Sequence, residues 1–173
     1  MMKTVLAALA LLSATVVSPL VGQGDDEANR KTLAGLNGVQ VWVGSIPDEV
    51  QRDGLDTMQI RTDVELKLRQ AGIPVPTEQQ SLSRVNAPVL YVNIGALKRR
   101  PGVVLYAFWA NVELHQFVRL TRNPAVTVRV ATWSAPGALG MVGQENLRSH
   151  VRDEIRDQTD RFINAYLAAN PKR

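Results

Sequence analysis

The chain has 173 residues, of which 45% are hydrophobic, 21% are charged and only 5% are aromatic. This length suits one domain, and this hydrophobic fraction excludes a chain that is disordered throughout. Cysteine is absent, which excludes disulfides, thiolate metal ligands, a cysteine nucleophile and lipidation on a cysteine. With only two histidines, a histidine-rich metal site is nearly excluded too, and we expect no cofactor.

The N-terminus has the pattern of a secretory signal peptide. Lys3 supplies a positive charge, residues 5–12 form a compact apolar run, and residues 4–24 contain no charged side chain. An uncleaved membrane anchor is the alternative, because this stretch is just long enough to span a bilayer. Pro19 and the polar residues around it argue against an anchor. We therefore predict a signal peptide over residues 1–22 and a periplasmic or secreted protein.

The charge balance of the chain is modestly positive. It carries 20 Lys and Arg against 16 Asp and Glu, a net charge of +4, which becomes +3 (19 against 16) without the lysine of the signal peptide. No long run of like charges occurs, and an exported protein has little access to nucleic acid, so we expect no nucleic-acid partner. The expected partner is an envelope protein or a second copy of the chain, with a membrane surface as the alternative.

The pattern after the signal peptide predicts a mobile polar leader over residues 23–36 and a single α/β domain over residues 37–171. Alternating apolar residues predict a first strand at 39–43. A helix is expected over 55–71, because Asp56 is a good N-cap residue and Gly72 stands where a left-handed glycine ends a helix.

The second half of the domain is β-rich and ends in a helix. Alternation predicts strands from residue 88 to about 97, from 103 to 120 and from 126 to 133, and a glycine-containing loop over 134–144. Apolar side chains at helical spacing from Leu147 then predict a long C-terminal helix that ends before Asn170 and Pro171.

These elements predict an α+β fold. The order β-α-β-β-β-α, with one apolar face on each strand, predicts a two-layer sandwich in which a mixed four-stranded sheet carries both helices on one face. The other sheet face would then be open.

Two segments carry a resemblance to known proteins: residues 62–74, which run from Thr62 into Ala71-Gly72-Ile73-Pro74, and residues 162–171, which begin Phe162-Ile163-Asn164. Both resemble stretches of an uncharacterised family of exported bacterial proteins, and the likeness covers most of residues 38–171. The element order is also similar in layout to the small α/β envelope domains of the TolB N-terminus and of curli-secretion lipoproteins. The resemblance implies an envelope interaction role and carries no catalytic residue.

The alternation predicts which side chains occupy the open face. Tryptophan is enriched at binding hot spots, so an exposed set of tryptophans on one face indicates an interface. The residues expected to form this interaction face are Trp42, Trp109, His115, Arg129 and Trp133.

Two further groups offer alternatives. Lys98, Arg99 and Arg100 lie in a predicted hairpin turn, where they could touch an anionic surface. Glu113 and His115 lie on the same strand face roughly 7 Å apart along the strand, which makes them a candidate general acid–base pair. Such a pair also needs a third group or a pocket to orient it, and the sequence shows neither.

The function expected from the sequence is a non-catalytic binding or interaction module that uses its open sheet face. The alternative is a hydrolase or lyase of unknown substrate that uses Glu113 and His115.

Overall fold

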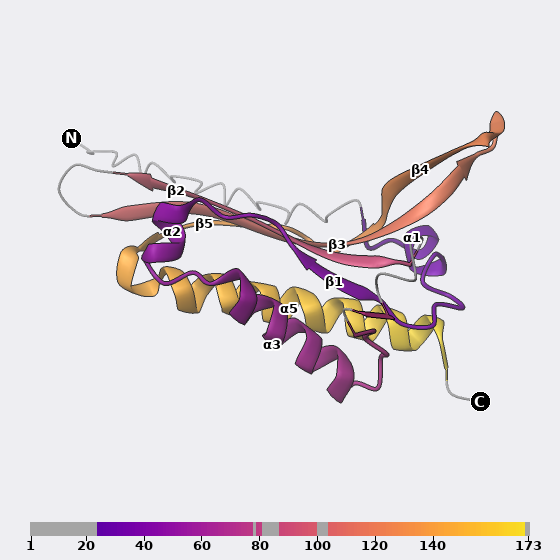
Figure 1. The fold of residues 1–173 in the computed structure, drawn as a ribbon, viewed down its shortest axis with the longest axis horizontal. Helices are drawn as coiled ribbons and strands as arrows, with labels where there is room; N and C mark the ends of the chain where they lie inside the picture. Colours follow the sequence, from indigo (N-terminus) through magenta and orange to yellow (C-terminus); the bar gives the residue numbers. More distant parts are fainter. Residues whose placement is uncertain (1–23, 78, 81–86, 100–103, 172–173) are drawn as a thin grey trace, which may run out of the picture.

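The computed structural model describes residues 24–77, 79–80, 87–99 and 104–171, so the predicted signal peptide lies outside the described residues. The chain folds into two layers, a mixed sheet and a helical layer below it (Figure 1). This confirms the α+β fold class. The elements in chain order are α1 (Glu27–Lys31), β1 (Gln40–Val43), α2 (Asp48–Arg52), α3 (Thr57–Gln70), β2 (Val89–Arg99), β3 (Leu105–Leu120), β4 (Asn123–Ser134), β5 (Ala138–Gly143) and α5 (Gln144–Ala169).

Helix α3 begins and ends where its sequence signals predict. The carboxylate of Asp56 accepts a hydrogen bond from the Met58 N–H at 2.8 Å, which satisfies one unpaired donor of the first turn. Gly72 adopts φ = +77°, a left-handed conformation that glycine reaches without a Cβ clash. The predicted helix over 55–71 is therefore confirmed to within two residues at each end.

The strands are ordered β1-β2-β3-β4, with β1 parallel to β2 and the other pairs antiparallel. The expected loop over 134–144 is wrong, because β5 within it pairs with the first half of β3, beyond the end of β4. The sheet thus has five strands. Gly140 lies opposite Phe108, and a Cβ on Gly140 would stand only 2.8 Å from the Phe108 ring, so glycine here makes room for an aromatic neighbour.

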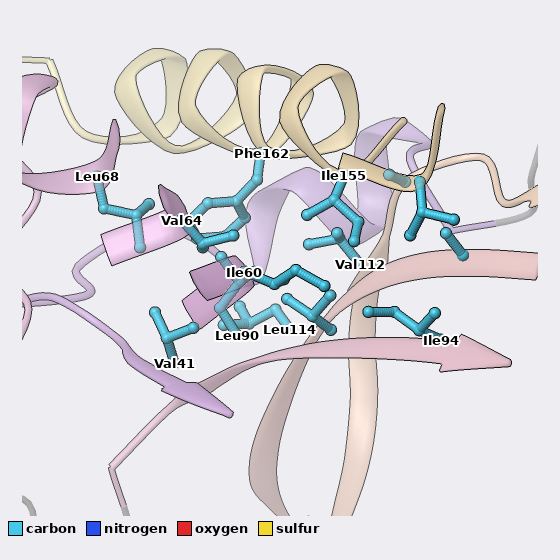
Figure 2. Packing of buried hydrophobic residues seen from close by; sticks show 14 of the residues in the cluster. Val41, Ile60, Val64, Leu68, Leu90, Ile94, Val112, Leu114, Ile155 and Phe162 are labelled. Carbon is cyan, nitrogen blue, oxygen red and sulfur yellow. The ribbon is translucent and has the colours of Figure 1, made fainter. Parts of the chain in front are cut away.

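The core lies between the sheet and helices α3 and α5. Side chains of both helices meet the even-numbered residues of β2 and β3, and Figure 2 shows them converging from the two layers. The labelled residues of this cluster are Val41, Ile60, Val64, Leu68, Leu90, Ile94, Val112, Leu114, Ile155 and Phe162. Each is at most 3% exposed, so the helices bury this face of the sheet over β1, β2 and the first part of β3.

Gln158 of α5 closes a gap in the sheet. Strands β4 and β5 both pair with β3, but β5 ends its pairing at Ala110 and β4 begins at Glu113. The Gln158 side chain, 2% exposed, accepts a hydrogen bond from the Val112 N–H at 2.8 Å and donates one to the Ala110 carbonyl at 3.1 Å. A side-chain amide therefore replaces the missing backbone partner.

The predicted mobile leader is wrong for residues 24–36, which pack onto the domain. Leu33 is fully buried, and the Ser134 N–H donates to the Gly24 carbonyl at 3.0 Å. Asp25 accepts hydrogen bonds from Arg30 at 2.8 and 2.9 Å and from the indole N–H of Trp133 at 2.7 Å. Because a buried indole N–H needs an acceptor, this polar segment supplies a contact that the core requires.

We expect the contact of Asp25 to make the protein acid-sensitive. The hydrogen bond from Arg30 holds the pKa of the Asp25 carboxyl below its usual value of about 4. A lowered folded-state pKa stabilises the fold above that value, and this stability is lost as the pH falls through the folded pKa. Urea midpoints measured between about pH 6 and about pH 2 should therefore fall more steeply for the native chain than for Asp25→Asn. Urea midpoints that fall equally with pH in the native chain and in Asp25→Asn would contradict this role of Asp25.

Candidate interaction face

Within the part of the chain that the structure describes, the open face is the side of the sheet that carries no helix (Figure 1). It presents the odd-numbered residues of β2, β3 and β5 and the even-numbered residues of β1, because successive side chains on a strand point to opposite faces. The register forms three rows in which residues of neighbouring strands lie side by side. They are Trp42–Tyr91–Glu113, Gly95–Trp109–Leu139 and Leu97–Ala107–Met141.

Two of these rows form an exposed apolar patch, which we define as Leu97, Trp109, Leu139 and Met141. Their exposed fractions are 61%, 48%, 84% and 66%, and they lie on the adjacent strands β2, β3 and β5. Single exposed apolar side chains are ordinary, whereas neighbouring ones on one surface mark interaction sites. The sequence predicted Trp109, but it missed Leu139 and Met141 because β5 was expected to be a loop.

Gly95 explains how Trp109 is held in the apolar patch. A Cβ on Gly95 would stand 1.8 Å from the six-membered ring of the Trp109 indole, so the indole lies flat across the glycine on the neighbouring strand. Glycine gives the sheet no side chain of its own here, and the indole covers the exposed backbone instead. Trp109 is thus fixed in orientation while about half of its surface stays exposed.

Arg129 connects two distant strands at the other end of the open face. Its guanidinium lies 4.8 Å from the ring centre of Trp42 and 4.7 Å from that of Phe117. Both distances are within the range of cation–π attraction. The structure therefore brings together Trp42 and Arg129, two residues predicted for the interaction face, and adds Phe117, which the sequence did not single out.

The carboxylate of Glu113 and the imidazole of His115 are in contact on the open face. His115 Nε2 lies 2.8 Å from Glu113 Oε2, and the Asn111 amide donates to Glu113 Oε1 at 2.7 Å. The His115 ring also lies 5.3 Å from that of Tyr91. The pair can exchange a proton, but its polar atoms are engaged with each other, and neither cavity described below is lined by it. The geometry therefore favours a polar part of a binding face.

The expectation that Trp133 lies on the open face is wrong. It is 1% exposed and makes an edge contact with Phe162 of α5 at 5.4 Å between ring centres. The cause is a β-bulge: Leu114 pairs with Trp133, but His115 pairs with Ala131, so Thr132 is an extra residue in β4. One extra residue moves the next side chain to the opposite face.

The expectation that Lys98 contacts an anionic surface is also wrong. Lys98 lies within β2, its side chain is 10% exposed, and its ammonium is paired with Asp53 at 2.5 Å. Tyr106 and Gln144 also donate hydrogen bonds to Asp53, so this carboxylate ties several elements together. The hydrogen bond to Asp53 raises the pKa of Lys98, and burial raises the pKa of Tyr106. Arg99 is exposed at the end of β2, and Arg100 lies outside the described residues.

The described residues also line two hollows, one between the helices and one at the β1 edge of the sheet. The larger, a groove of about 410 Å³ between α3 and α5, has an apolar floor and is rimmed by the ion pairs Asp63–Arg152 and Lys67–Asp160, both 2.6 Å long. The smaller lies beside β1 and is lined by Trp42 and Tyr91 among others. The charges on the rim of the groove neutralise each other, so it offers no charge preference for a ligand.

Within the described ranges, no group of three or more His, Asp or Glu side chains could hold a metal ion. None of the helices in the same ranges is both long and apolar enough to cross a membrane.

Comparison with known proteins finds three matching chains among the solved structures. No protein-family model matches the chain, and no curated protein matches it. The chain is similar to a minor lipoprotein from Acinetobacter baumannii, whose crystal structure was solved at 2.35 Å. The TM-score is 0.40 and the sequence identity 10%, over 78% of this chain and 93% of that chain. A similarity at this level assigns no function.

Proposed function

We propose that this protein is a non-catalytic binding module of the cell envelope whose open sheet face binds another protein. The observation that carries the proposal is the apolar patch, where four large side chains on three neighbouring strands are between 48% and 84% exposed. Apolar patches of this kind on soluble proteins mark interaction surfaces. The envelope location rests on the signal peptide that the sequence predicts over residues 1–22.

The charge of the chain favours a different protein over a second copy as the partner. The chain carries a net charge of +4, and two copies of it repel each other. Near the open face, Arg129 and Arg119 are not balanced by any acidic residue in the segment 114–144. A partner with an apolar centre and acidic side chains at its rim would complement this surface.

The test is a double substitution within the apolar patch, Trp109→Ser with Met141→Ser. Captures from envelope extract by the native chain, by this variant and by a control variant are compared by quantitative mass spectrometry. The control, Leu66→Ser with Leu167→Ser, removes two exposed leucines, 52% and 38% exposed, from the helical layer. A partner that binds the open face should lose about 30-fold or more in affinity with the patch variant, the effect of one hot-spot residue, and none with the control.

The purified partner and the two variants then give the decisive measurement. Both variants change exposed side chains, so their melting temperatures should stay close to that of the native chain. Equal affinity of the partner for the patch variant and the native chain excludes the open face as its binding site. Light scattering of the native chain should give the monomer mass, and a dimer that the patch variant abolishes would overturn the choice of partner.

A further inference from the structure

A two-stranded arm extends from the sheet beyond the end of β2. The last pair between β2 and β3 is Val89 with His115, so beyond His115 the described part of β3 pairs only with β4. We define the hairpin arm as residues 115–131. Figure 1 shows it bending away from the helical layer and projecting past the rest of the sheet.

The hairpin arm carries only positive formal charge. No acidic residue occurs from Leu114 through Gln144, whereas Arg119, Arg122 and Arg129 all lie within the arm. Arg119 and Arg122 are exposed, and Arg129 is held between its two aromatic rings. In contrast, the acidic residues of the described chain, except Glu113, lie in helices or loops. The arm therefore attracts negatively charged partners.

The outer edge of β4 is divided into a covered part and an accessible part. β4 is the last strand of the sheet order, so its second edge faces away from β3. Near the domain this edge is covered, since Ser134 bonds to Gly24 and the Thr32 hydroxyl reaches the Thr132 carbonyl at 3.4 Å. From 127 to 131, β4 keeps a regular pairing with β3, and in the described residues no backbone bond to its outer edge is found.

The sequence of this edge suits a further strand. Residues 126–131 are alternating Val with Thr, Arg and Ala, a composition of high β-propensity, and Val126 and Val130 are each 37% exposed. Proteins commonly protect such an edge with inward charges, proline or a short strand. Here the protection stops at the bulge beside Thr132, which leaves a row of backbone groups able to pair with another chain.

The contact of Arg129 with Trp42 and Phe117 holds the hairpin arm in place before any partner arrives. An isolated two-stranded ribbon is only marginally stable in water. Because Trp42 belongs to β1, this stack ties the arm to the far side of the sheet. A pre-ordered edge lowers the entropy cost of pairing with a further strand.

We propose that the β4 edge over Thr127–Ala131 binds an extended acidic segment of another protein by strand addition. Main-chain hydrogen bonds would supply the pairing, and Arg119 and Arg122 would select acidic side chains. A second copy is disfavoured because two arms of like charge repel. A membrane is disfavoured because the tip residues 121–123, Thr-Arg-Asn, offer no apolar side chain to insert.

The probe is a synthetic peptide of alternating Glu and Val, labelled for fluorescence anisotropy. The native chain should bind it, and binding should weaken about tenfold or more between about 0.05 M and about 0.3 M salt, because exposed charges are screened. Arg119→Glu with Arg122→Glu should weaken it by a similar factor. The control, Arg52→Glu with Arg148→Glu, changes two exposed arginines outside the arm and should bind normally.

Backbone pairing is tested separately from charge. Two further peptides carry N-methyl groups on alternate residues. In one peptide these groups block one edge of the extended strand, and in the other peptide they block the opposite edge. Strand addition uses one edge, so one of these peptides should fail to bind while the other succeeds. Hydrogen exchange at the backbone amides of Thr127–Ala131 should also be slower when the peptide is bound. The proposal would be overturned if the Glu-Val peptide did not bind, or if both N-methylated peptides bound equally well. It would also be overturned if a Lys-Val peptide bound as tightly as the Glu-Val peptide, or if the protein bound anionic phospholipid vesicles in preference to the peptide.

This site is separate from the apolar patch. The patch variant Trp109→Ser with Met141→Ser should bind the acidic peptide as the native chain does, because neither residue lies in the hairpin arm. Loss of peptide binding in that variant would overturn the separation of the two sites. If the open face binds no partner, the expected binding of the acidic peptide to the hairpin arm is unaffected. Each of the two proposals can therefore fail without the other.

Discussion

Replacing Trp133 by Ala should destabilise the protein by about 3–5 kcal/mol, the usual cost of removing a fully buried aromatic side chain. The indole is 1% exposed, packs against Phe162 and donates its N–H to Asp25. The substitution removes this packing and leaves the Asp25 carboxylate without one of its donors. Urea denaturation followed by circular dichroism measures the change in the free energy of unfolding.

Trp109→Ala is the matched control for this prediction, since it removes the same side chain from the opposite face of the sheet. Trp109 is 48% exposed, so the expected cost is about 1 kcal/mol or less. Similar losses in both variants would contradict the bulge at Thr132 that places the two tryptophans on different faces.

Gln158→Leu should cost about 2–5 kcal/mol, although it replaces a polar side chain by an apolar one in the core. The reason is that the Val112 N–H and the Ala110 carbonyl lose the partner that closes the gap between β4 and β5. Each buried backbone group left without a hydrogen bond costs about 1–3 kcal/mol. The measurement is again the free energy of unfolding in urea.

Two controls separate the lost hydrogen bonds from other effects of the change. Gln70→Leu alters an exposed glutamine of α3 and should change stability by about 0.5 kcal/mol or less. In the Gln158→Leu variant, amide exchange should speed up most at Val112. A variant as stable as the native chain would show that the amide of Gln158 is not required to complete the sheet.

Local patterns in the sequence predict the framework of the fold. Alternation predicts strands β1 to β4, because one face of each strand must be apolar to meet the helices. Asp56 and Gly72 delimit α3, because capping depends on neighbouring residues alone. These signals are local, and the two-layer architecture follows from them.

Other features depend on contacts between segments distant in the sequence. The bulge at Thr132 inverts the orientation of Trp133, and no residue near it predicts this. Gly137, Gly140 and Gly143 indicate a loop, yet Gly140 is small because Phe108 on β3 occupies the space beside it. The polar leader packs because its Asp25 meets a tryptophan that is far along the chain.

The candidate site, like the fold, was predictable where it depends on local alternation and not where it depends on contacts between distant segments. Alternation correctly places Glu113 and His115 on one face, where they are in contact at 2.8 Å. The pairing of Arg129 with Trp42 needs the bend of the hairpin arm, which brings strands from opposite sides of the sheet together. Leu139 and Met141 join the apolar patch only once β5 is recognised as a strand.

The uneven charge of the two layers gives the molecule an electric polarity. Among the described strands Glu113 is the one acidic residue against four basic ones, Lys98, Arg99, Arg119 and Arg129, whereas the five acidic residues of α5 are nearly balanced by its four arginines. A protein with such a dipole rotates in the field of a negatively charged body during diffusion. It therefore approaches that body with the β-sheet leading and its helices trailing, and its orientation is selected before the first contact forms.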